Sequence, residues 1–321
     1  MSSLQKEIDE RTNLAGTNRF ELLLFRLGTD AVLGQSELFG INVLKVREIV
    51  TMPAITPIAG APKFSLGVVH LRDQVIPVYD LPAIIGCKLA AAPTLMLVTE
   101  YARTTQAFTV ESVEDIVRLE WNQVISAENT GTGPSLITSI ARLTEGSGDE
   151  ARLAQVLDVE AILQAITPEA NRHQVDPREV GDKFALKPGT VVLVADDSFV
   201  ARALMEQTLK AMDIPYEMVK SGQEAWSRLN TLAAAAEAEG KTIHDKVCLM
   251  LTDLEMPEMD GFTLTRNIKQ DPRFNAMPVV IHSSLSGSAN ENHVRSVGAN
   301  GYVPKFSAEE LSTAIRKALG R

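Results

Sequence analysis

The chain has 321 residues, of which 45% are hydrophobic and 22% are charged, and its formal net charge is −10. This length allows two domains with separate cores, and the composition is ordinary for a globular protein. The acidic balance argues against a nucleic-acid partner, because phosphate backbones are bound by basic faces and none is evident. No apolar run reaches membrane-spanning length, and the polar N-terminus lacks a signal-peptide pattern. We therefore expect a cytoplasmic protein without direct membrane insertion.

Strand-like runs dominate the first half. Five such runs are separated by turn residues, and they span residues 19–27, 68–81, 94–101, 106–119 and 153–163. Residues 42–50 add a short helical piece. The half contains no glycine-rich phosphate loop, no metal-ligand spacing and no pairing of a nucleophile with a base. We interpret it as a mostly-β domain that binds partners rather than catalysing a reaction.

Polar and charged residues, with two prolines and two glycines, fill residues 171–190. This composition is typical of a linker that has little to bury. The different patterns on either side of it favour a domain boundary. We therefore predict four segments, namely a flexible N-terminus over 1–17, a first domain over 18–170, a linker over 171–187 and a second domain over 188–321.

Short apolar runs that end in polar residues characterise the second half. They are VVLVADDS at 191–198, LMLTDLEMPEMDG at 249–261, VVIHSS at 279–284 and GYVPKF at 301–306. The first three have strand length, and the carboxyl ends of parallel strands line one crevice. Apolar residues at helical spacing follow Ser198 and Ser307, each of which can cap a helix. Strands that alternate with helices predict an α/β doubly wound parallel sheet.

The charges at these strand ends do not balance. Asp196, Asp197 and Asp253 are accompanied by a single cation, Lys305. Two like charges ~4 Å apart repel by about 4 kcal/mol at an effective dielectric of ~20, so the cluster needs a further counter-ion. Oxygen ligands favour Mg²⁺ over Zn²⁺. With Mg²⁺ and Lys305 beside it, Asp253 is able to attack a phosphoryl group and hold it as an aspartyl-phosphate, while Ser283 is placed to hydrogen-bond a phosphoryl oxygen.

The second half resembles the receiver domain of two-component response regulators over residues 187–321. The resemblance rests on the order of an acidic pair, an aspartate followed by xxMPxMDG, a strand-end serine and a lysine. It implies a flavodoxin-like fold with five parallel strands. It also implies roles for seven residues, namely the phosphoacceptor Asp253, the Mg²⁺ ligands Asp196, Asp197, Asp253 and the backbone carbonyl of Glu255, the switch residues Ser283 and Tyr302, and the phosphate-sensing Lys305.

Two features depart from the receiver pattern. Phe306 follows the lysine, where the family usually has a proline. Residues 226–247 are longer than a minimal connection and look like an extended alanine-rich helix plus a loop. We assign no function to this extension.

The first half resembles the chemotaxis coupling protein CheW, a pair of small SH3-like β-barrels, over residues 18–168. The resemblance rests on three stretches, at residues 38–50, 67–81 and 110–117. The middle stretch matches a family pattern of asparagine, leucine, arginine and glycine. His70 and Asp73 replace the asparagine and the glycine, while Leu71 and Arg72 remain.

This resemblance implies a partner-binding face. On it, Arg72, Val46 and Glu48 engage the cytoplasmic helical tip of a chemoreceptor. Without the family pattern, Arg72 would be interpreted as an exposed hairpin arginine and Val46 as a core valine.

A coupling domain followed by a receiver resembles the architecture of the CheV family of chemotaxis proteins. This implies a signal-transduction protein that links chemoreceptor tips to a histidine kinase, which is its phosphodonor and its partner in a receptor array. The expected location is the cytoplasm, at arrays on the inner face of the membrane. Phosphorylation of Asp253 would add a charge of about −1.5 to −2 and regulate coupling. We do not expect an enzyme in the usual sense.

Other functions for such a chain are a phosphate sink, a transcriptional response regulator and a phosphohydrolase. The transcriptional function is disfavoured because the chain is acidic and ends after the expected last receiver helix. The phosphohydrolase is disfavoured because Glu255, and no aspartate, stands two residues after Asp253.

Overall fold

The computed structural model describes residues 20–30, 34–89, 91–101, 104–127, 136–143, 152–166, 175, 178, 180–284, 294, 296–305 and 307–320. Contacts divide the chain into two compact units that part between residues 171 and 172. The expected flexible segment 1–17 and Phe306 lie outside the described residues. The domain limits given above remain predictions.

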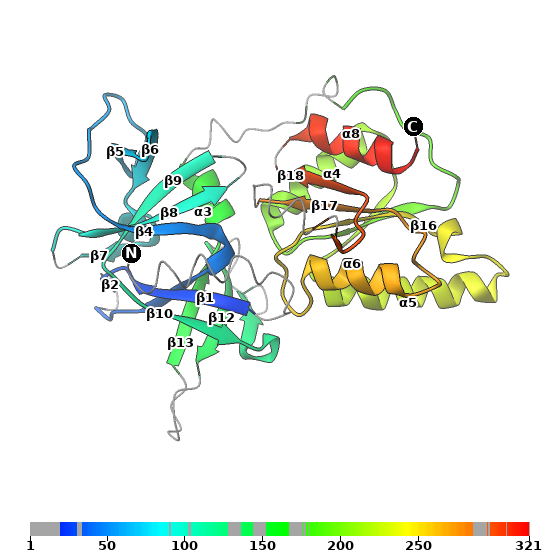
Figure 1. The fold of residues 1–321 in the computed structure, drawn as a ribbon, viewed down its shortest axis with the longest axis horizontal. Coiled ribbons are helices and arrows are strands. Elements are labelled where there is room, and N and C mark those ends of the chain that lie inside the picture. The colour runs from blue at the N-terminus through cyan, green and yellow to red at the C-terminus, as the bar shows by residue number, and fades with distance from the viewer. Residues whose placement is uncertain are drawn as a thin grey trace. The chain divides into compact units, whose positions relative to one another are not determined.

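One sheet of the first unit has six strands in the order β10-β1-β3-β13-β12-β11. Figure 1 labels β1, β10, β12 and β13 among them. They are β1 (Phe20–Arg26), β3 (Leu38–Asn42), β10 (Ser112–Leu119), β11 (Val124–Ser126), β12 (Ile137–Leu143) and β13 (Arg152–Leu157). Neighbouring strands are antiparallel except β3 and β13. Alternate residues of a strand share a face, and Leu22 and Leu24 accordingly join Val156 in one buried cluster.

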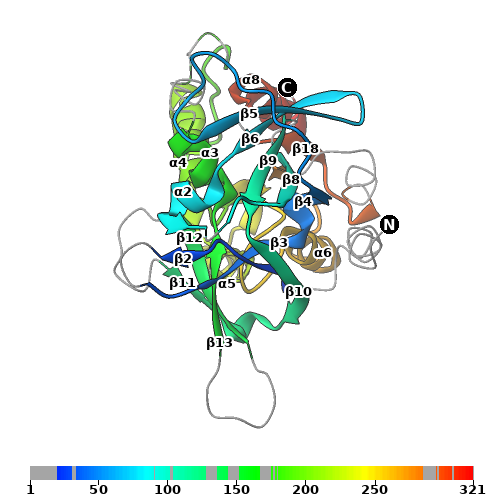
Figure 2. The same ribbon diagram turned by 90° about the vertical axis from the view of Figure 1, so that its left-hand side faces the viewer.

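The other large sheet of this unit has five strands in the order β4-β8-β9-β6-β5. They are β4 (Val46–Thr51), β5 (Ser65–Leu71), β6 (Gln74–Tyr79), β8 (Leu95–Tyr101) and β9 (Thr104–Val110). Figure 2 shows the hairpin of β5 and β6. The remaining elements are β2 (Thr29–Asp30) paired with β7 (Cys87–Lys88), α2 (Leu81–Ile85), α3 (Val159–Ile166), η2 (Val43–Lys45) and η3 (Trp121–Gln123). The prediction of a mostly-β first half is confirmed.

Two predicted elements of this unit differ from the structure. Residues 42–50 form only one 3₁₀ turn before β4, because the β-branched residues of β4 favour a strand and pair with β8. The strand-like run 153–163 contains β13 and then α3. The helix starts there because Asp158 Oδ1 accepts a hydrogen bond from the Ala161 N–H at 3.0 Å, which caps the helix.

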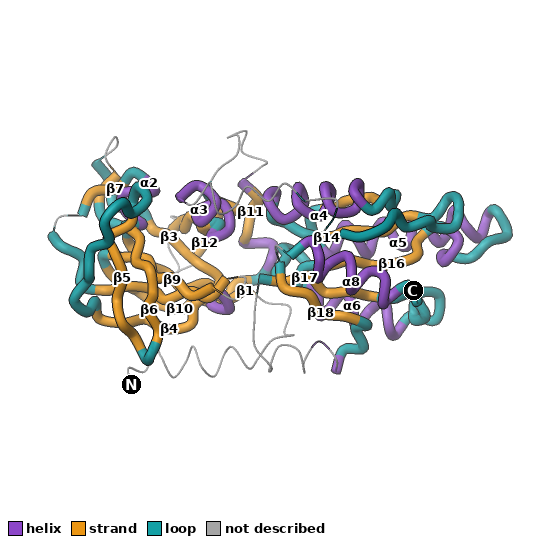
Figure 3. The backbone as a smooth tube through the Cα atoms, turned by 90° about the horizontal axis from the view of Figure 1, so that it is seen from above, coloured by secondary structure: helices purple, strands orange, loops and turns teal. Residues whose placement is uncertain are grey.

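The second unit is a parallel sheet of five strands in the order β15-β14-β16-β17-β18. They are β14 (Val191–Ala195), β15 (Tyr216–Val219), β16 (Val247–Thr252), β17 (Val279–Ser283) and β18 (Gly301–Pro304). The helical elements that lie wholly within the described residues include α4 (Phe199–Ala211), α5 (Gly222–Ala238), η5 (Ile243–Asp245), α6 (Gly261–Gln270) and α8 (Ala308–Ala318). Figure 3 shows helices alternating with these strands. The predicted doubly wound α/β fold is confirmed.

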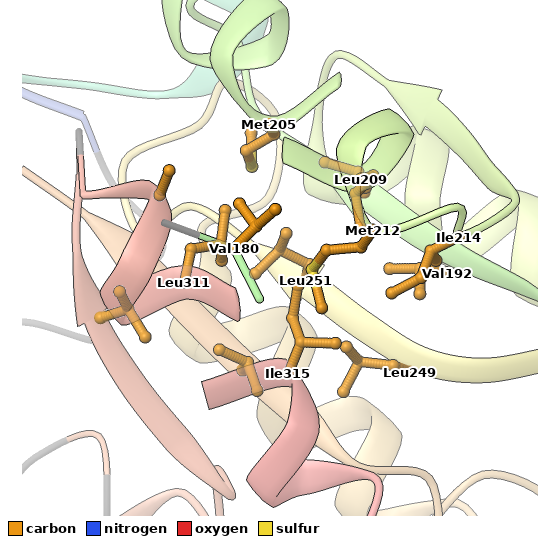
Figure 4. Close-up of a cluster of buried hydrophobic side chains, with 14 of the residues drawn as sticks. Val180, Val192, Met205, Leu209, Met212, Ile214, Leu249, Leu251, Leu311 and Ile315 are labelled. Carbon is orange, nitrogen blue, oxygen red and sulfur yellow. The ribbon is translucent and has the colours of Figure 1, made fainter. Parts of the chain in front are cut away.

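Helices pack on the sheet of the second unit in two pairs. Apolar residues of α4 and α8 share one buried cluster, shown in Figure 4, and those of α5 and α6 share another. The predicted caps are present, since Ser198 Oγ accepts from the Ala201 N–H at 3.3 Å and Ser307 Oγ accepts from the Glu310 N–H at 3.1 Å. Within the described ranges, no helix has both the length and the hydrophobicity needed to cross a membrane.

The segment before β14 is more buried than its composition predicts. Val180 and Phe184 are only 1% and 4% exposed, and both join the cluster that α4 and α8 form. The prediction that residues 171–190 have little to bury is therefore wrong for these two side chains. Two apolar residues within a polar segment produce no periodic pattern, so their burial depends on tertiary contacts that local sequence does not encode.

Candidate functional site

The parallel sheet brings the predicted acidic residues together. Asp196 and Asp197 directly follow β14, and Asp253 directly follows β16. These two strands are neighbours, and their last residues pair with each other in the ladder. As a result, one carboxylate oxygen from each of the three aspartates lies within 4.8 Å of the others.

Lys305 completes this cluster, which we call the acidic site. Its Nζ lies 3.0 Å from Asp196 Oδ2 and 2.9 Å from Asp253 Oδ2, and the lysine is only 3% exposed. The residue directly follows β18, and its main-chain N–H donates to the carbonyl of Ser283 at 2.9 Å. The ammonium therefore bridges two buried carboxylates that come from different strands.

Main-chain groups orient the two buried carboxylates. Asp196 Oδ1 accepts from the Ser198 N–H at 2.9 Å, and Asp253 Oδ1 accepts from the Leu254 N–H at 2.7 Å. The guanidinium of Arg202, on the first turn of α4, donates to the main-chain carbonyl of Asp196 at 2.7 Å. Sequence reasoning missed Arg202, because no motif marks an arginine that binds a carbonyl six residues before it.

The fold of the loop after Asp253 accounts for the aspartate and the glycine that end the MPEMDG motif. The Gly261 N–H donates to the Leu254 carbonyl at 2.9 Å, and a Cβ at Gly261 would collide with the carbonyl of Asp253. Only glycine permits this close approach. Asp260 Oδ1 then caps α6 by accepting from the Thr263 N–H at 2.6 Å, and burial raises the pKa of the Asp260 carboxyl. The motif thus folds the chain tightly back beneath the aspartate.

The other predicted site residues lie on adjoining segments. Ser283 is the last residue of β17 and is fully buried, and its main chain contacts Lys305 as described. Tyr302 lies on β18 opposite Ile281 and is half-buried. Glu255 lies in the loop after β16, with both carboxylate oxygens shielded from solvent. Their functional roles stay predictions.

The donor set of the acidic site fits a hard divalent cation. Among the described residues, three carboxylates cluster beside the Lys305 ammonium, and the Arg202 guanidinium binds the main chain of Asp196, so carboxylates outnumber these two cations in a mostly buried site. The converging ligand atoms are all oxygens, the donors that Mg²⁺ prefers. The residues present here are therefore compatible with Mg²⁺.

In the first unit, Arg72 occupies the hairpin turn between β5 and β6. Arg72 and Asp73 have φ values of 47° and 64°, and the flanking residues Leu71 and Gln74 pair with each other. Positive φ at both central residues is typical of a type I′ turn, in which aspartate replaces glycine at modest cost. The side chain of Arg72 is 67% exposed and pairs with Glu48 at 2.9 Å.

The structure corrects one member of the predicted partner-binding face. Val46 is 2% exposed, so its side chain belongs to the core and offers a partner no surface. Glu48 is 7% exposed and reaches the surface mainly through its ion pair with Arg72. Burial of Val46 follows from its place in β4 beside β8. We therefore keep only Arg72 and Glu48 as candidates for partner contact.

Comparison with known families identifies both units. Residues 21–167 match the CheW-like domain, and residues 192–316 match the response regulator receiver domain. A CheW-like domain implies coupling to chemoreceptors and the kinase CheA in general.

Solved structures similar to each unit include the scaffolding protein TtCheW of Thermoanaerobacter tengcongensis. It is 20% identical, with a TM-score of 0.36, and the match covers 44% of this chain and 91% of that one. The chemotaxis response regulator CheY4 of Vibrio cholerae is 23% identical, with a TM-score of 0.32 and coverage of 40% of this chain and 98% of that one.

Relatives that match over nearly the whole chain combine both domains. Chemotaxis protein CheV2 of Helicobacter pylori is 26% identical over 98% of this chain and 99% of its own length. Chemotaxis protein CheV3 of the same organism is 28% identical over 95% of this chain and 96% of its own length. The chain therefore belongs to the CheV family of chemotaxis proteins, in which a CheW-like coupling domain is joined to a receiver domain.

Proposed function

We propose that the first unit couples chemoreceptor tips to a CheA-type histidine kinase, and that phosphorylation of Asp253 in the second unit regulates this coupling. The observation that carries the proposal is the position of Lys305, whose ammonium bridges Asp196 and Asp253 within a buried site that retains excess negative charge. A site of this kind is suited to a cation and a phosphoryl group. Association with receptor arrays on the inner face of the membrane follows from this function.

Asp253 accepts the phosphoryl group in this mechanism. The N–P bond of the donor phosphohistidine breaks as an O–P bond to the Asp253 carboxylate forms, and the histidine ring keeps the electron pair. Lys305 Nζ, already 2.9 Å from Asp253 Oδ2, then pairs with a phosphoryl oxygen. Asp196, Asp197, Asp253 and the carbonyl of Glu255 would hold Mg²⁺, which would supply positive charge that offsets the phosphoryl oxygens.

Ser283 and Tyr302 convert phosphorylation into a change of conformation. Ser283 ends β17, and its carbonyl accepts from the Lys305 main-chain N–H, so the serine lies next to the phosphate-sensing lysine. In the phosphorylated state its hydroxyl donates to a phosphoryl oxygen. Tyr302 changes its position when Ser283 does, because it lies on β18, the strand next to β17. The added charge of about −1.5 to −2 shifts the receiver between two states.

Phosphoryl transfer from a radiolabelled CheA-type kinase tests the acceptor. We expect transfer to the unmodified chain in the presence of Mg²⁺, and a loss of at least about a hundredfold in Asp253→Asn, because an amide is a poor nucleophile. The matched control is Asp213→Asn, which makes the same substitution at an exposed aspartate in the same unit. Label on Asp253→Asn at the unmodified rate would contradict the assignment.

Co-sedimentation with receptor tips and kinase tests the coupling function. We expect the full chain to join the receptor–kinase complex, and acetyl phosphate with Mg²⁺ to change the amount bound in the unmodified chain but not in Asp253→Asn. A chain that takes up phosphate and never joins the complex would instead be a phosphate sink.

A further inference from the structure

Residues 180–186, which we call the strap, lie against the face of the receiver unit formed by α4 and α8. Val180 and Phe184 are buried in the cluster that these helices share, and Leu186 packs against it. Figure 4 shows Val180 among Met205 from α4 and Leu311 from α8. The strap thus inserts its apolar side chains between two helices.

Polar contacts tie the strap to both helices as well. The Arg316 guanidinium, on the last turn of α8, donates to the carbonyls of Val180 and Asp182 and lies 5.6 Å from the centre of the Phe184 ring. The Phe184 N–H donates at 2.7 Å to the carbonyl of Met212, which ends α4. These directional bonds fix the strap relative to the distal ends of both helices.

The same two helices begin at the acidic site. Helix α4 starts directly after Asp196, Asp197 and their capping serine, and α8 starts three residues after Lys305. An α-helix of 13 residues such as α4 spans about 20 Å and moves largely as a rigid rod. The acidic site therefore lies at the start of both helices, and the strap contacts their opposite ends.

We propose that the α4–α8 face is the output surface of this receiver, and that its ligand is the strap of the same chain. The strap follows the CheW-like unit in the sequence, and residues 187–190 separate it from β14, so its release or retention changes the segment that joins the two units. This inference rests on the proposed phosphorylation of Asp253. The contacts described above belong to the state in which Lys305 bridges two carboxylates, so rearrangement of that bridge loosens them.

Amide hydrogen exchange of the full chain, followed by mass spectrometry, tests the inference. The probe is beryllofluoride with Mg²⁺, which stands in for the phosphoryl group, and ¹⁹F NMR reports independently whether it is bound. We expect peptides that contain Phe184 to exchange about tenfold faster when beryllofluoride is bound, while peptides from β14 stay protected. Beryllofluoride bound with strap exchange unchanged or slower would overturn the inference and leave the proposed function intact.

A matched pair of variants separates the strap contact from a general charge effect. Arg316→Met removes the guanidinium that holds the strap, whereas Lys317→Met removes the neighbouring exposed cation of the same helix. We expect Arg316→Met alone to raise strap exchange about tenfold without beryllofluoride and to reduce the further change on its addition. Equal exchange in the two variants would overturn the role of Arg316. Failure of beryllofluoride to bind the unmodified chain would instead refute the proposed function, and the output role with it.

Discussion

The two units differ in how they balance buried negative charge. In the CheW-like unit, each of two buried glutamates has a cation beside it: Glu48 pairs with Arg72 at 2.9 Å, and Glu160 lies 3.9 Å from Lys45. Such one-to-one arrangements leave little net charge. They are compatible with a domain whose surface contacts other proteins and whose interior performs no chemistry.

The receiver unit shows a different arrangement among its described residues, because three aspartates cluster and the Lys305 ammonium pairs with two of them, Asp196 and Asp253. Bringing like charges together in a folded protein costs stability unless a ligand compensates them. An excess of clustered carboxylates over neighbouring cations, rather than the burial of a charge as such, therefore indicates a ligand site. Substitutions that remove one carboxylate from the charge balance of each unit should therefore have opposite effects on stability.

The two tryptophans allow the units to be followed separately. Trp121 packs against Phe20 in the CheW-like unit, with ring centroids 5.0 Å apart, and Trp226 packs edge-on to Phe274 in the receiver, at 5.5 Å. The chain has only these two tryptophans. Urea unfolding monitored by tryptophan fluorescence therefore reports the receiver in a Trp121→Phe background and the CheW-like unit in a Trp226→Phe background.

The largest expected effect comes from Lys305→Met. It leaves Asp196 and Asp253 buried without their cation, and removal of one partner of a buried ion pair typically costs about 3–5 kcal/mol. We expect the free energy of unfolding of the receiver to fall by that amount in EDTA, and Mg²⁺ to restore part of it. The control Lys317→Met, at an exposed lysine, should change it by less than about 0.5 kcal/mol. A similar value for both variants would show that Lys305 does not balance the acidic site.

Asp197→Asn is expected to raise the unfolding free energy of the receiver, by less than Lys305→Met lowers it. This substitution removes one of three mutually repelling carboxylates, so the receiver should gain about 1–2 kcal/mol of unfolding free energy in EDTA. Mg²⁺ should stabilise the variant less than the unmodified chain, because one ligand oxygen has lost its charge. Urea unfolding with and without Mg²⁺ measures both quantities.

The matched substitution in the other unit is Glu160→Gln, which removes a carboxylate that has a cation beside it. We expect it to lower the unfolding free energy of the CheW-like unit by about 1 kcal/mol and to be indifferent to Mg²⁺. If Asp197→Asn and Glu160→Gln changed stability in the same direction, the contrast between the units would fail.

Reversal of charge at Arg72 tests the proposed partner face. Arg72→Glu places a second carboxylate beside Glu48, and we expect receptor-tip binding to weaken about tenfold, or about 1.4 kcal/mol, with phosphorylation of Asp253 by soluble kinase unchanged. Arg118→Glu, which breaks an exposed pair with Glu21 on the other sheet, is the control and should bind normally. Equal binding by Arg72→Glu and the control would remove Arg72 from the interface.

The sequence was sufficient to predict a site residue where a local pattern indicates both a strand and the residue that follows it. The apolar runs before Asp196 and Asp253 predict β14 and β16, and parallel strand order then brings the two aspartates together. The helix caps at Ser198 and Ser307 were predictable for the same reason, since a cap acts within three residues. The clustering of the acidic site needed no information beyond these local signals and the rule for parallel strand ends.

Sequence was insufficient where burial depends on distant partners. The side chains of Val180 and Phe184 are buried by α4 and α8, although the segment around them is polar. Val46 is part of a strand whose neighbour begins about fifty residues later, and only that pairing decides which way its side chain points. Arg202 binds a main-chain carbonyl, a partner that has no residue identity to recognise.

The smallest change in unfolding free energy is expected where positive and negative side chains are unequal in number but exposed to solvent. On the first unit, Glu114 accepts hydrogen bonds from Arg152 at 2.8 Å and from Arg26 at 2.5 Å, so one carboxylate faces two cations. The hydrogen bond from Arg152, with that from Arg26, holds the pKa of Glu114 below its ordinary value. The three side chains are 28–38% exposed, so water and salt screen their charges. This excess of positive charge therefore indicates no ligand.

Glu114→Gln should lower the unfolding free energy of the CheW-like unit by only about 0.5 kcal/mol near neutral pH. Because the folded-state pKa of Glu114 is lowered, its contribution is present above the ordinary glutamate value and is lost as the pH falls through the folded-state pKa. The difference between the variant and the unmodified chain should accordingly vanish in acid, below the lowered folded-state pKa, and should also shrink in about 1 M salt. A difference in unfolding free energy above about 2 kcal/mol that persists in acid and in high salt would contradict this prediction. Exposed and buried clusters of unequal charge would then have similar energies, and excess charge would not distinguish the acidic site from the protein surface.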